Sequence, residues 1–312
     1  MTTPNTNNNI KYLRVELIGG LCNKLFCLIS AIDICLLEGY VLIEPDFGWK
    51  RPVKMGDIWN LDKLIAGVSG LKIISQAELS IQQDTVIINK SGTELWKYSE
   101  TILAKQRAEC RLSRSGDTCC RVIACLEPCS ELLSRIAGGF ENSIAVHFRT
   151  ETDWLEYSKR KQRRMPAGER VWTNNADIAG MVMREFGQDA KIFFTCGENR
   201  DEITSLFATC GENRSEITGL LGNKRAQCYY NDDLEYEQNA ALNWYICSIA
   251  GGGFVGLSRS TFSNLICLKR ALAGIGGECW IYNWGNAGLV RRVDMGLQPE
   301  AEKAIKKVTI LV

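Results

Sequence analysis

Two polar side chains that could do chemistry follow a short apolar run. The run is residues 144–146, I-A-V, and it is followed by His147, the only histidine of the chain, and by Arg149. A continuous apolar run is typical of a buried strand in a parallel sheet, and residues two apart on a strand share a face. Open α/β sheets bind ligands at the carboxyl ends of their strands, and a guanidinium fork matches phosphate oxygens. The pair predicts either an anion site or an ion pair that closes the strand.

A second group of polar side chains follows another predicted strand, Phe254-Val255. Residues 257–264 read L-S-R-S-T-F-S-N and lead into an apolar helix expected over Leu265–Ala273. Hydroxyls before a helix indicate either an ordinary N-cap or a phosphate site at the helix N-terminus. The preceding Gly251–Gly256 run matches the letters G-x-G-x-x-G, but a dinucleotide fingerprint needs a strand before it and a helix directly after it. A predicted helix precedes these glycines, so their context is wrong for that fingerprint.

The N-terminal part of the chain predicts the unit that opens a parallel sheet. Residues Lys11–Ile18 alternate polar and apolar side chains and predict a strand. Helical spacing of apolar residues predicts a helix from near Asn23 to Gly39, and Val41–Ile43 predicts a second strand. Strand, Gly19-Gly20 turn, helix and strand make a βαβ unit. The turn and the helix N-terminus direct backbone N–H groups toward an anion.

The rest of the chain predicts an α/β protein of two domains, 1–140 and 141–312, divided near Gly138-Gly139. The last predicted helix either stays in the second domain or packs back on the first. Residues 45–56 predict a loop, and the basic stretch 159–170 is either a solvated loop or a mobile flap over a negatively charged ligand. Further strands are expected at 71–74, 85–88, 121–126, 190–194, 226–230 and 278–282, and helices at 128–137, 176–186, 235–250 and 300–307.

Residues 195–222 contain a tandem repeat. Thr195–Ala208 reads T-C-G-E-N-R-D-E-I-T-S-L-F-A, and Thr209–Gly222 reads T-C-G-E-N-R-S-E-I-T-G-L-L-G. Two copies are too few for a solenoid, and each opens with Thr-x-x-Glu, the signature of a helix start. We expect a surface insertion outside the site. The second copy either extends the helix of the first or, because Gly211 resists helix, makes a second short helix.

Composition limits the class of protein. The 312 residues are 46% hydrophobic and 23% charged, with a net charge of +1. These values are typical of a globular protein and argue against a nucleic-acid or membrane-surface binder. The sequence shows no signal-peptide core and no apolar run that could span a bilayer, so we expect a cytoplasmic protein. The 14 cysteines form no C-x-x-C pair, and we expect buried thiols and no metal site.

Three stretches together resemble the fucosyltransferase superfamily that includes the protein O-fucosyltransferases. Residues 19–26, G-G-L-C-N-K-L-F, are similar to its G-G-x-x-N-Q-x-F, and residues 147–154, H-F-R-T-E-T-D-W, to its H-x-R-x-x-x-D-W. Residues 254–256 and 260–263, F-V-G and S-T-F-S, are similar to its F-I-G…S-S-F-S. The resemblance implies a GT-B fold of two Rossmann-like domains that face each other across a cleft, without a metal ion. The acceptor belongs to the first domain and the sugar nucleotide to the second.

The resemblance also implies which residues form the site. Arg149 matches the arginine that contacts the donor diphosphate, and Asn23 matches the loop asparagine near the reacting sugar, so both are expected to be catalytic. Lys24 replaces the usual glutamine, and Gly20 stands where the protein O-fucosyltransferases carry an arginine. Asn243 stands where an aspartate that helps hold the nucleotide is common, which leaves the donor's base and sugar open. The expected substrate- and nucleotide-binding residues are Gly19, Gly20, Leu21, Cys22, His147, Asp153, Asn243, Ser260, Thr261 and Phe262.

The implied function is an inverting, metal-independent glycosyltransferase that moves L-fucose from GDP-fucose to a glycan or protein hydroxyl. The sugar nucleotide is a co-substrate, and no cofactor is expected. Loss of a diphosphate builds negative charge, which an arginine, helix N-terminal amides and hydroxyls stabilise. The alternatives are another donor (GDP-mannose or a UDP-sugar), an inactive sugar-nucleotide-binding protein, and a nicotinamide-dependent oxidoreductase. The general base stays open among Glu16, Asp33, Glu44, Asp46 and Asp153.

Overall fold

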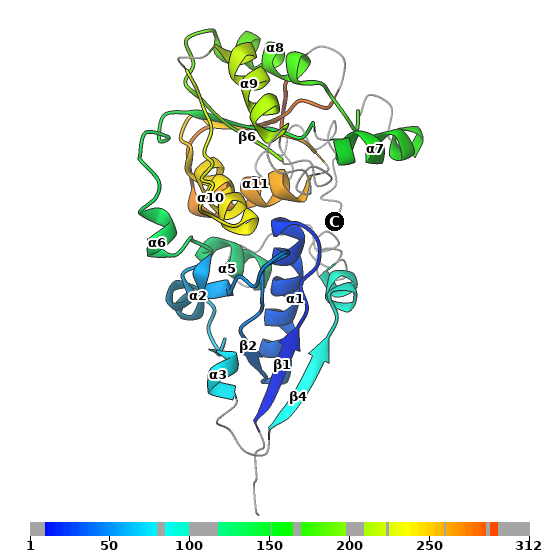
Figure 1. Cartoon of the computed structure of the whole chain (residues 1–312), viewed down its shortest axis with the longest axis vertical. Coiled ribbons are helices and arrows are strands. Elements are labelled where there is room, and N and C mark those ends of the chain that lie inside the picture. The colour runs from blue at the N-terminus through cyan, green and yellow to red at the C-terminus, as the bar shows by residue number, and fades with distance from the viewer. Residues whose placement is uncertain are drawn as a thin grey trace, which may run out of the picture. The chain divides into compact units, whose positions relative to one another are not determined.

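The computed structural model describes residues 10–79, 85–99, 118–150, 152–164, 170–197, 209–222, 225–258, 260–284 and 288–292. The chain forms two compact units. Of the described residues, unit 1 comprises those up to Leu133 together with the short segment Glu235–Gln238, and unit 2 comprises those from Ser134 to Leu234 and from Asn239 onward. Each unit is described by itself below, and Figure 1 gives the element labels.

Unit 1 contains a four-stranded sheet in the order β3-β2-β1-β4, in which every pairing is parallel. The predicted strands at 71–74 and 85–88 are confirmed, as is the opening βαβ unit. Because the chain winds from β1 to β2 and β3 on one side and places β4 on the other, the strand order reverses between β1 and β4. The strands are β1 (Lys11–Val15), β2 (Val41–Ile43), β3 (Ile73–Ile74) and β4 (Val86–Lys90).

The long helix α1 (Leu21–Glu38) packs against β1 and β2 (Figure 1, blue). It ends as predicted at Gly39, whose φ of 70° is the left-handed conformation that glycine adopts most readily. The other helices of unit 1 are short, and one more covers residues 92–99. They are η1 (Met55–Asp57), α2 (Leu61–Gly67), α3 (Gln76–Leu79), α5 (Thr118–Cys125) and α6 (Ser130–Leu133).

The strand predicted at 121–126 is wrong, because these residues belong to α5 and its C-terminal end. The apolar run looks like a strand by composition, yet its buried side chains recur at helical spacing. Cys119, Val122, Ile123 and Leu126 are all buried, while Ala124 is exposed. Packing of one helical face therefore outweighs the strand preference of the β-branched residues.

Unit 2 contains a six-stranded sheet in the order β10-β9-β8-β5-β6-β7, parallel except for the β9–β10 pair. From β5 the chain winds to β6 and β7 on one side, then to β8 and β9 on the other. The order therefore reverses between β5 and β8. The strand at β10 was not predicted. The strands are β5 (Ile144–Phe148), β6 (Ile192–Cys196), β7 (Ala226–Gln227), β8 (Gly253–Gly256), β9 (Cys279–Ile281) and β10 (Val290–Arg291).

Helices α8 to α11 connect the parallel strands of unit 2, and the core forms where α8 and α9 meet β5, β6 and β8. The glycine run at 251–256 follows helix α10 and itself enters β8, so the dinucleotide context is absent as expected. The predicted closing helix at 300–307 lies outside the described residues. The helices are α7 (Thr152–Lys161), η2 (Gln162–Arg164), α8 (Asn175–Phe186), α9 (Thr209–Leu221), α10 (Tyr236–Ile249) and α11 (Thr261–Ala273).

Two expectations about unit 2 need correction. The basic stretch is not a loop throughout, because α7 and η2 continue to Arg164, with Trp154 stacked on Tyr157 one turn later. The second copy of the repeat is not a surface insertion. It forms α9, which packs beside α8 (Figure 1), and Ile217 and Leu221 are buried in the core. Thr195 of the first copy lies in β6, so it starts no helix, and residues 198–208 lie outside the described part.

The described cysteines are free thiols, and most of them are buried.

Within the described residues, no helix combines the length and the apolarity that crossing a membrane requires.

Candidate functional site

The carboxyl end of β5 presents His147 and Arg149 at the point where the unit 2 sheet reverses its strand order. All five residues of β5 are buried, so the strand carries its polar end into the interior. His147 is buried and Arg149, one residue beyond the strand, is half-buried. In open α/β sheets, the carboxyl ends of the strands at such a reversal form the ligand crevice.

Two aromatic residues fix the position of Arg149. Its backbone N–H donates to the hydroxyl of Tyr282, just beyond β9, at 3.2 Å. Its guanidinium carbon lies 5.2 Å from the ring centre of Trp154, a cation–π distance. Trp154 in turn donates from Nε1 to the carbonyl of Val171 at 2.8 Å. The spacing of Arg149 and Trp154 in the sequence thus corresponds to a contact that holds the arginine side chain.

His147 is held by the first turn of α11. Its Nδ1 lies 2.9 Å from Oγ of Ser263, and its ring centre lies 4.7 Å from that of Phe262. Burial and, to a smaller extent, the neighbouring Arg149 charge together lower the pKa of His147 to about 3. The imidazole is therefore neutral at physiological pH.

The N-terminus of α11 adds hydroxyls and backbone amides beside β8. Ser260 is the N-cap residue and its Oγ accepts from the Ser263 backbone N–H at 3.4 Å. Thr261 and Phe262, both half-buried, form the first turn. A helix of this length carries a partial positive charge at its start. Unit 2 thus brings His147, Ser260 and Phe262 together through Ser263.

The Gly19-Gly20 turn and the first turn of α1 occupy the corresponding place in unit 1, after β1. Gly19 has a φ of 81°, and a Cβ there would lie 2.7 Å from Nδ2 of Asn23, so the asparagine side chain folds over the glycine backbone. Gly20 is the N-cap residue of α1 and offers no side chain. Leu21 and Cys22 are buried, and burial raises the pKa of the Cys22 thiol. These two residues therefore offer a ligand their backbone amides and no reactive thiolate.

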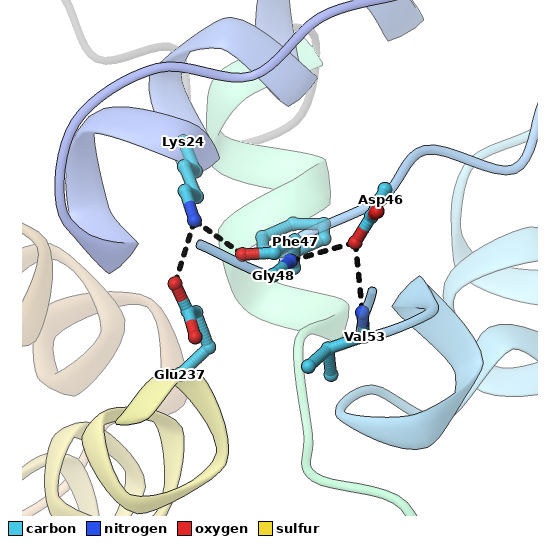
Figure 2. A network of polar contacts seen from close by, with 6 residues as sticks. All are labelled: Lys24, Asp46, Phe47, Gly48, Val53 and Glu237. Carbon is cyan, nitrogen blue, oxygen red and sulfur yellow. Dashed lines mark hydrogen bonds and ion pairs between the residues drawn. The ribbon is translucent and has the colours of Figure 1, made fainter. Parts of the chain in front are cut away.

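Lys24, in the first turn of α1, belongs to a buried polar network that was not predicted from the sequence (Figure 2). Nζ of Lys24 lies 2.7 Å from Oε1 of Glu237, and both side chains are 4% exposed. The same Nζ donates to the carbonyl of Phe47. Asp46, the neighbour of Phe47, accepts from the N–H groups of Gly48 and Val53 and so closes a tight turn. Lys24 thus ties the first turn of α1 to the 46–53 turn and to Glu237 within unit 1.

The remaining predicted residues are less directly placed. Asp153 lies in the first turn of α7. Asn243 lies on α10 and is buried, and its Nδ2 donates to the carbonyls of Tyr229 and Asn239 at 3.1 and 2.9 Å. Its Oδ1 is buried with no partner among the described residues. The two carbonyls require a donor, which explains why an amide and not a carboxylate stands here.

Several carboxylates considered for the general base serve as acceptors in unit 1. Asp33 accepts from the hydroxyls of Tyr98 and Thr118 at 2.9 and 2.6 Å. Glu44 accepts from the Gly56 N–H at 2.8 Å, and Asp46 closes the turn described above. Glu16 is exposed. Within the described residues, no group of three His, Cys, Asp or Glu side chains is arranged to hold a metal ion.

The fold is a GT-B fold, similar to that of solved fucosyltransferase structures. The chain aligns with the crystal structure of POFUT1 in complex with GDP-fucose at a TM-score of 0.57 and 12% identity, over 93% of this chain and 100% of the other. It aligns with POFUT1 in complex with GDP at 0.56 and 13%, over 90% and 100%. It aligns with the fucosyltransferase NodZ from Bradyrhizobium at 0.51 and 10%, over 91% and 98%. No protein-family model matches the sequence, and a search of curated proteins finds no match.

Three residues that shape these sites were not predicted from the sequence: Ser263, Tyr282 and Glu237. Ser263 was part of the quoted motif, and a hydroxyl one turn into a helix that follows a strand could have drawn attention to it. Tyr282 and Glu237 carried no local signal, because each acts on a residue more than 130 positions away.

Proposed function

We propose that the chain is an inverting glycosyltransferase that moves L-fucose from GDP-fucose to a hydroxyl group of a glycan or protein. The observation that carries this proposal is the reversal point of the unit 2 sheet, where β5 ends in His147 and Arg149 and the N-terminus of α11 follows β8. The structural likeness to POFUT1 bound to GDP-fucose supports the choice of donor.

In the proposed reaction, unit 2 stabilises the leaving nucleoside diphosphate. The bond between the sugar's anomeric carbon and the β-phosphate oxygen breaks, and the bonding electron pair stays on that oxygen. Arg149 provides a permanent charge and a bidentate fork for the diphosphate. The α11 N-terminus provides amides and the hydroxyls of Ser260 and Thr261. Donors that are already in place where charge develops lower the barrier without reorganisation.

Unit 1 is proposed to hold the acceptor. Asn23, folded over Gly19, offers a side-chain amide, and the backbone amides at the start of α1 offer further donors. The acceptor hydroxyl attacks the anomeric carbon from the face opposite the diphosphate, which inverts the configuration, and its proton passes to a carboxylate base. Asp33, Glu44 and Asp46 already accept hydrogen bonds, so the exposed Glu16 is the better candidate among the carboxylates of unit 1.

The experiment is a measurement of GDP release from GDP-fucose, with and without a mixture of glycan and peptide acceptors, in the presence and absence of EDTA. The proposal expects acceptor-stimulated GDP release that EDTA does not abolish. Loss of all turnover in EDTA, restored by manganese or magnesium, would contradict the metal-independent mechanism. Binding of GDP-fucose without any release would indicate an inactive sugar-nucleotide-binding protein.

A different donor is the second candidate, and Asn243 is the observation that favours it. Its Nδ2 already donates to two backbone carbonyls, and the uncharged amide does not supply the negatively charged acceptor that a nucleotide-holding aspartate provides. The same assay with GDP-mannose and UDP-sugars separates the two candidates by which nucleotide is released.

A further inference from the structure

The buried imidazole of His147 has one polar partner among the described residues, and this partner fixes its tautomer. Nδ1 lies 2.9 Å from Oγ of Ser263. Ser263 is fully buried, and the same Oγ accepts a hydrogen bond from the backbone N–H of Leu257 at 3.1 Å. These two contacts account for the polar environment of the hydroxyl.

Counting protons at Ser263 decides which ring nitrogen of His147 carries hydrogen. A hydroxyl has one proton to donate and lone pairs to accept with. Leu257 N–H occupies a lone pair, so the hydroxyl proton needs an acceptor, and among the described residues Nδ1 is the acceptor within reach. Nδ1 is then unprotonated, and the neutral ring carries its proton on Nε2. The reverse tautomer would leave the buried hydroxyl proton without a partner, which costs free energy.

Gly256 at the end of β8 makes this contact possible. A Cβ at residue 256 would lie 2.5 Å from Oγ of Ser263, closer than atoms pack. The glycine therefore lets the first turn of α11 approach the strands closely enough for Ser263 to reach His147.

The environment keeps the ring neutral over the working pH range. Burial and the Arg149 charge both hold the pKa of His147 near 3. The other described residues that lie against it are uncharged: Ser263 and Phe262 of α11, and Thr195, its register partner on β6.

We propose that Ser263 is a positioning residue that fixes His147 as the Nε2–H tautomer, and that this N–H donates to an oxygen of the bound nucleoside diphosphate. The ligand half of this inference rests on the proposed function. In this arrangement Arg149 provides the positive charge. The neutral ring of His147 adds no second cation and donates a single hydrogen bond in a fixed direction.

The test uses nitrogen NMR of the full-length protein labelled in the imidazole ring. Because His147 is the only histidine, its signals need no assignment. We expect a pyridine-type Nδ1 and a pyrrole-type Nε2, unchanged between about pH 5 and pH 9, a range over which an ordinary histidine titrates. A protonated Nδ1 in the neutral ring, or a titration near pH 6.5, would overturn the inference without any variant or ligand.

Two variants of Ser263 test whether its hydroxyl fixes the tautomer of His147. Ser263→Ala should produce a mixture of tautomers, and Ser263→Thr should restore the single tautomer. The matched control is Ser248→Ala, which removes an equally buried hydroxyl whose bond goes to the Trp244 carbonyl in its own helix. An unchanged ring spectrum in Ser263→Ala would overturn the positioning role.

Titration with GDP tests the ligand half. We expect GDP to shift the Nε2–H signal in the wild type. We expect His147→Asn, which lacks a donor at the Nε2 position, to bind GDP about tenfold more weakly, and His147→Gln, which restores one, to bind nearly normally. GDP binding that leaves Nε2–H unmoved would contradict the contact, whereas no GDP binding at all would instead contradict the proposed function.

Discussion

Arg149 provides the positive charge at the end of β5, and its surroundings decide where that charge lies. Its backbone is bonded to Tyr282 and its guanidinium lies over Trp154. We predict that Arg149→Ala abolishes transfer and weakens GDP binding. Arg149→Lys should rescue poorly, because a point charge cannot make the bidentate contact. Calorimetric titration with GDP and turnover with GDP-fucose check this, and unchanged affinity and activity in Arg149→Ala would refute it.

Asn243 gives a second prediction for a single residue. Its Nδ2 donates to two carbonyls, so Asn243→Asp would place a carboxylate against two acceptors in a buried site. The variant should lose about 1–3 kcal/mol of unfolding free energy, measured by denaturant titration near neutral pH. Lowering the pH toward the carboxyl pKa should recover part of the loss, because a protonated acid can donate. If Asn243→Asp were as stable as the wild type, the side chain would have to bind other partners.

At the scale of elements, the Lys24–Glu237 ion pair joins the first turn of α1 to the first turn of α10. Because both side chains are buried, removing one partner leaves an uncompensated charge. We predict that Lys24→Met or Glu237→Leu alone costs about 3–5 kcal/mol of stability, and that the double variant is close to neutral. The matched control is Glu235→Gln, which breaks an exposed pair with Arg51 and should change stability by less than about 1 kcal/mol. If the stability loss of the double variant equalled the sum of the two single losses, the two side chains would not interact as a pair.

Helix α9 gives the next prediction, because two adjacent leucines differ in burial. Leu221 is 1% exposed and Leu220 is 40% exposed. Leu221→Ala should cost about 2–5 kcal/mol, whereas Leu220→Ala should change stability little. Equal small effects in denaturant titrations would show that the second repeat copy lies on the surface after all.

Helices and strands whose apolar residues follow a clear pattern could be predicted from the sequence. Those whose structure depends on long-range packing could not. The apolar stripe of α1 and the Gly39 end predicted that helix, and short apolar runs predicted β2, β5 and β8. The strand prediction for residues 121–126 was wrong because a buried helix face and a buried strand have similar sequences over six residues. The prediction for the repeat was wrong because the sequences of two near-identical copies do not show which copy forms the helix that connects β6 to β7. At the site, His147 and Arg149 were predictable, but Glu237 and Tyr282 depend on contacts that only the fold creates.

At the scale of the whole molecule, His147 should make stability depend on pH. Its pKa is about 3 in the folded chain and about 6.5 when unfolded, so below about pH 6.5 the unfolded state binds a proton that the folded state does not. Unfolding free energy should therefore fall as the pH drops, by about 2 kcal/mol at about pH 5 from this residue alone. His147→Gln should lack this part of the slope. Parallel pH curves for the two proteins would contradict a buried neutral histidine.

Unit 2 is proposed to bind a guanosine diphosphate sugar. The most direct measurement is the thermal unfolding midpoint with GDP, GDP-fucose, GDP-mannose, UDP and NAD, because a ligand that binds the folded state raises its stability by mass action. We predict that GDP and GDP-fucose raise the midpoint of the wild type but not of Arg149→Ala, and that NAD raises neither. A shift with NAD or UDP alone, or an equal GDP shift in Arg149→Ala, would contradict it.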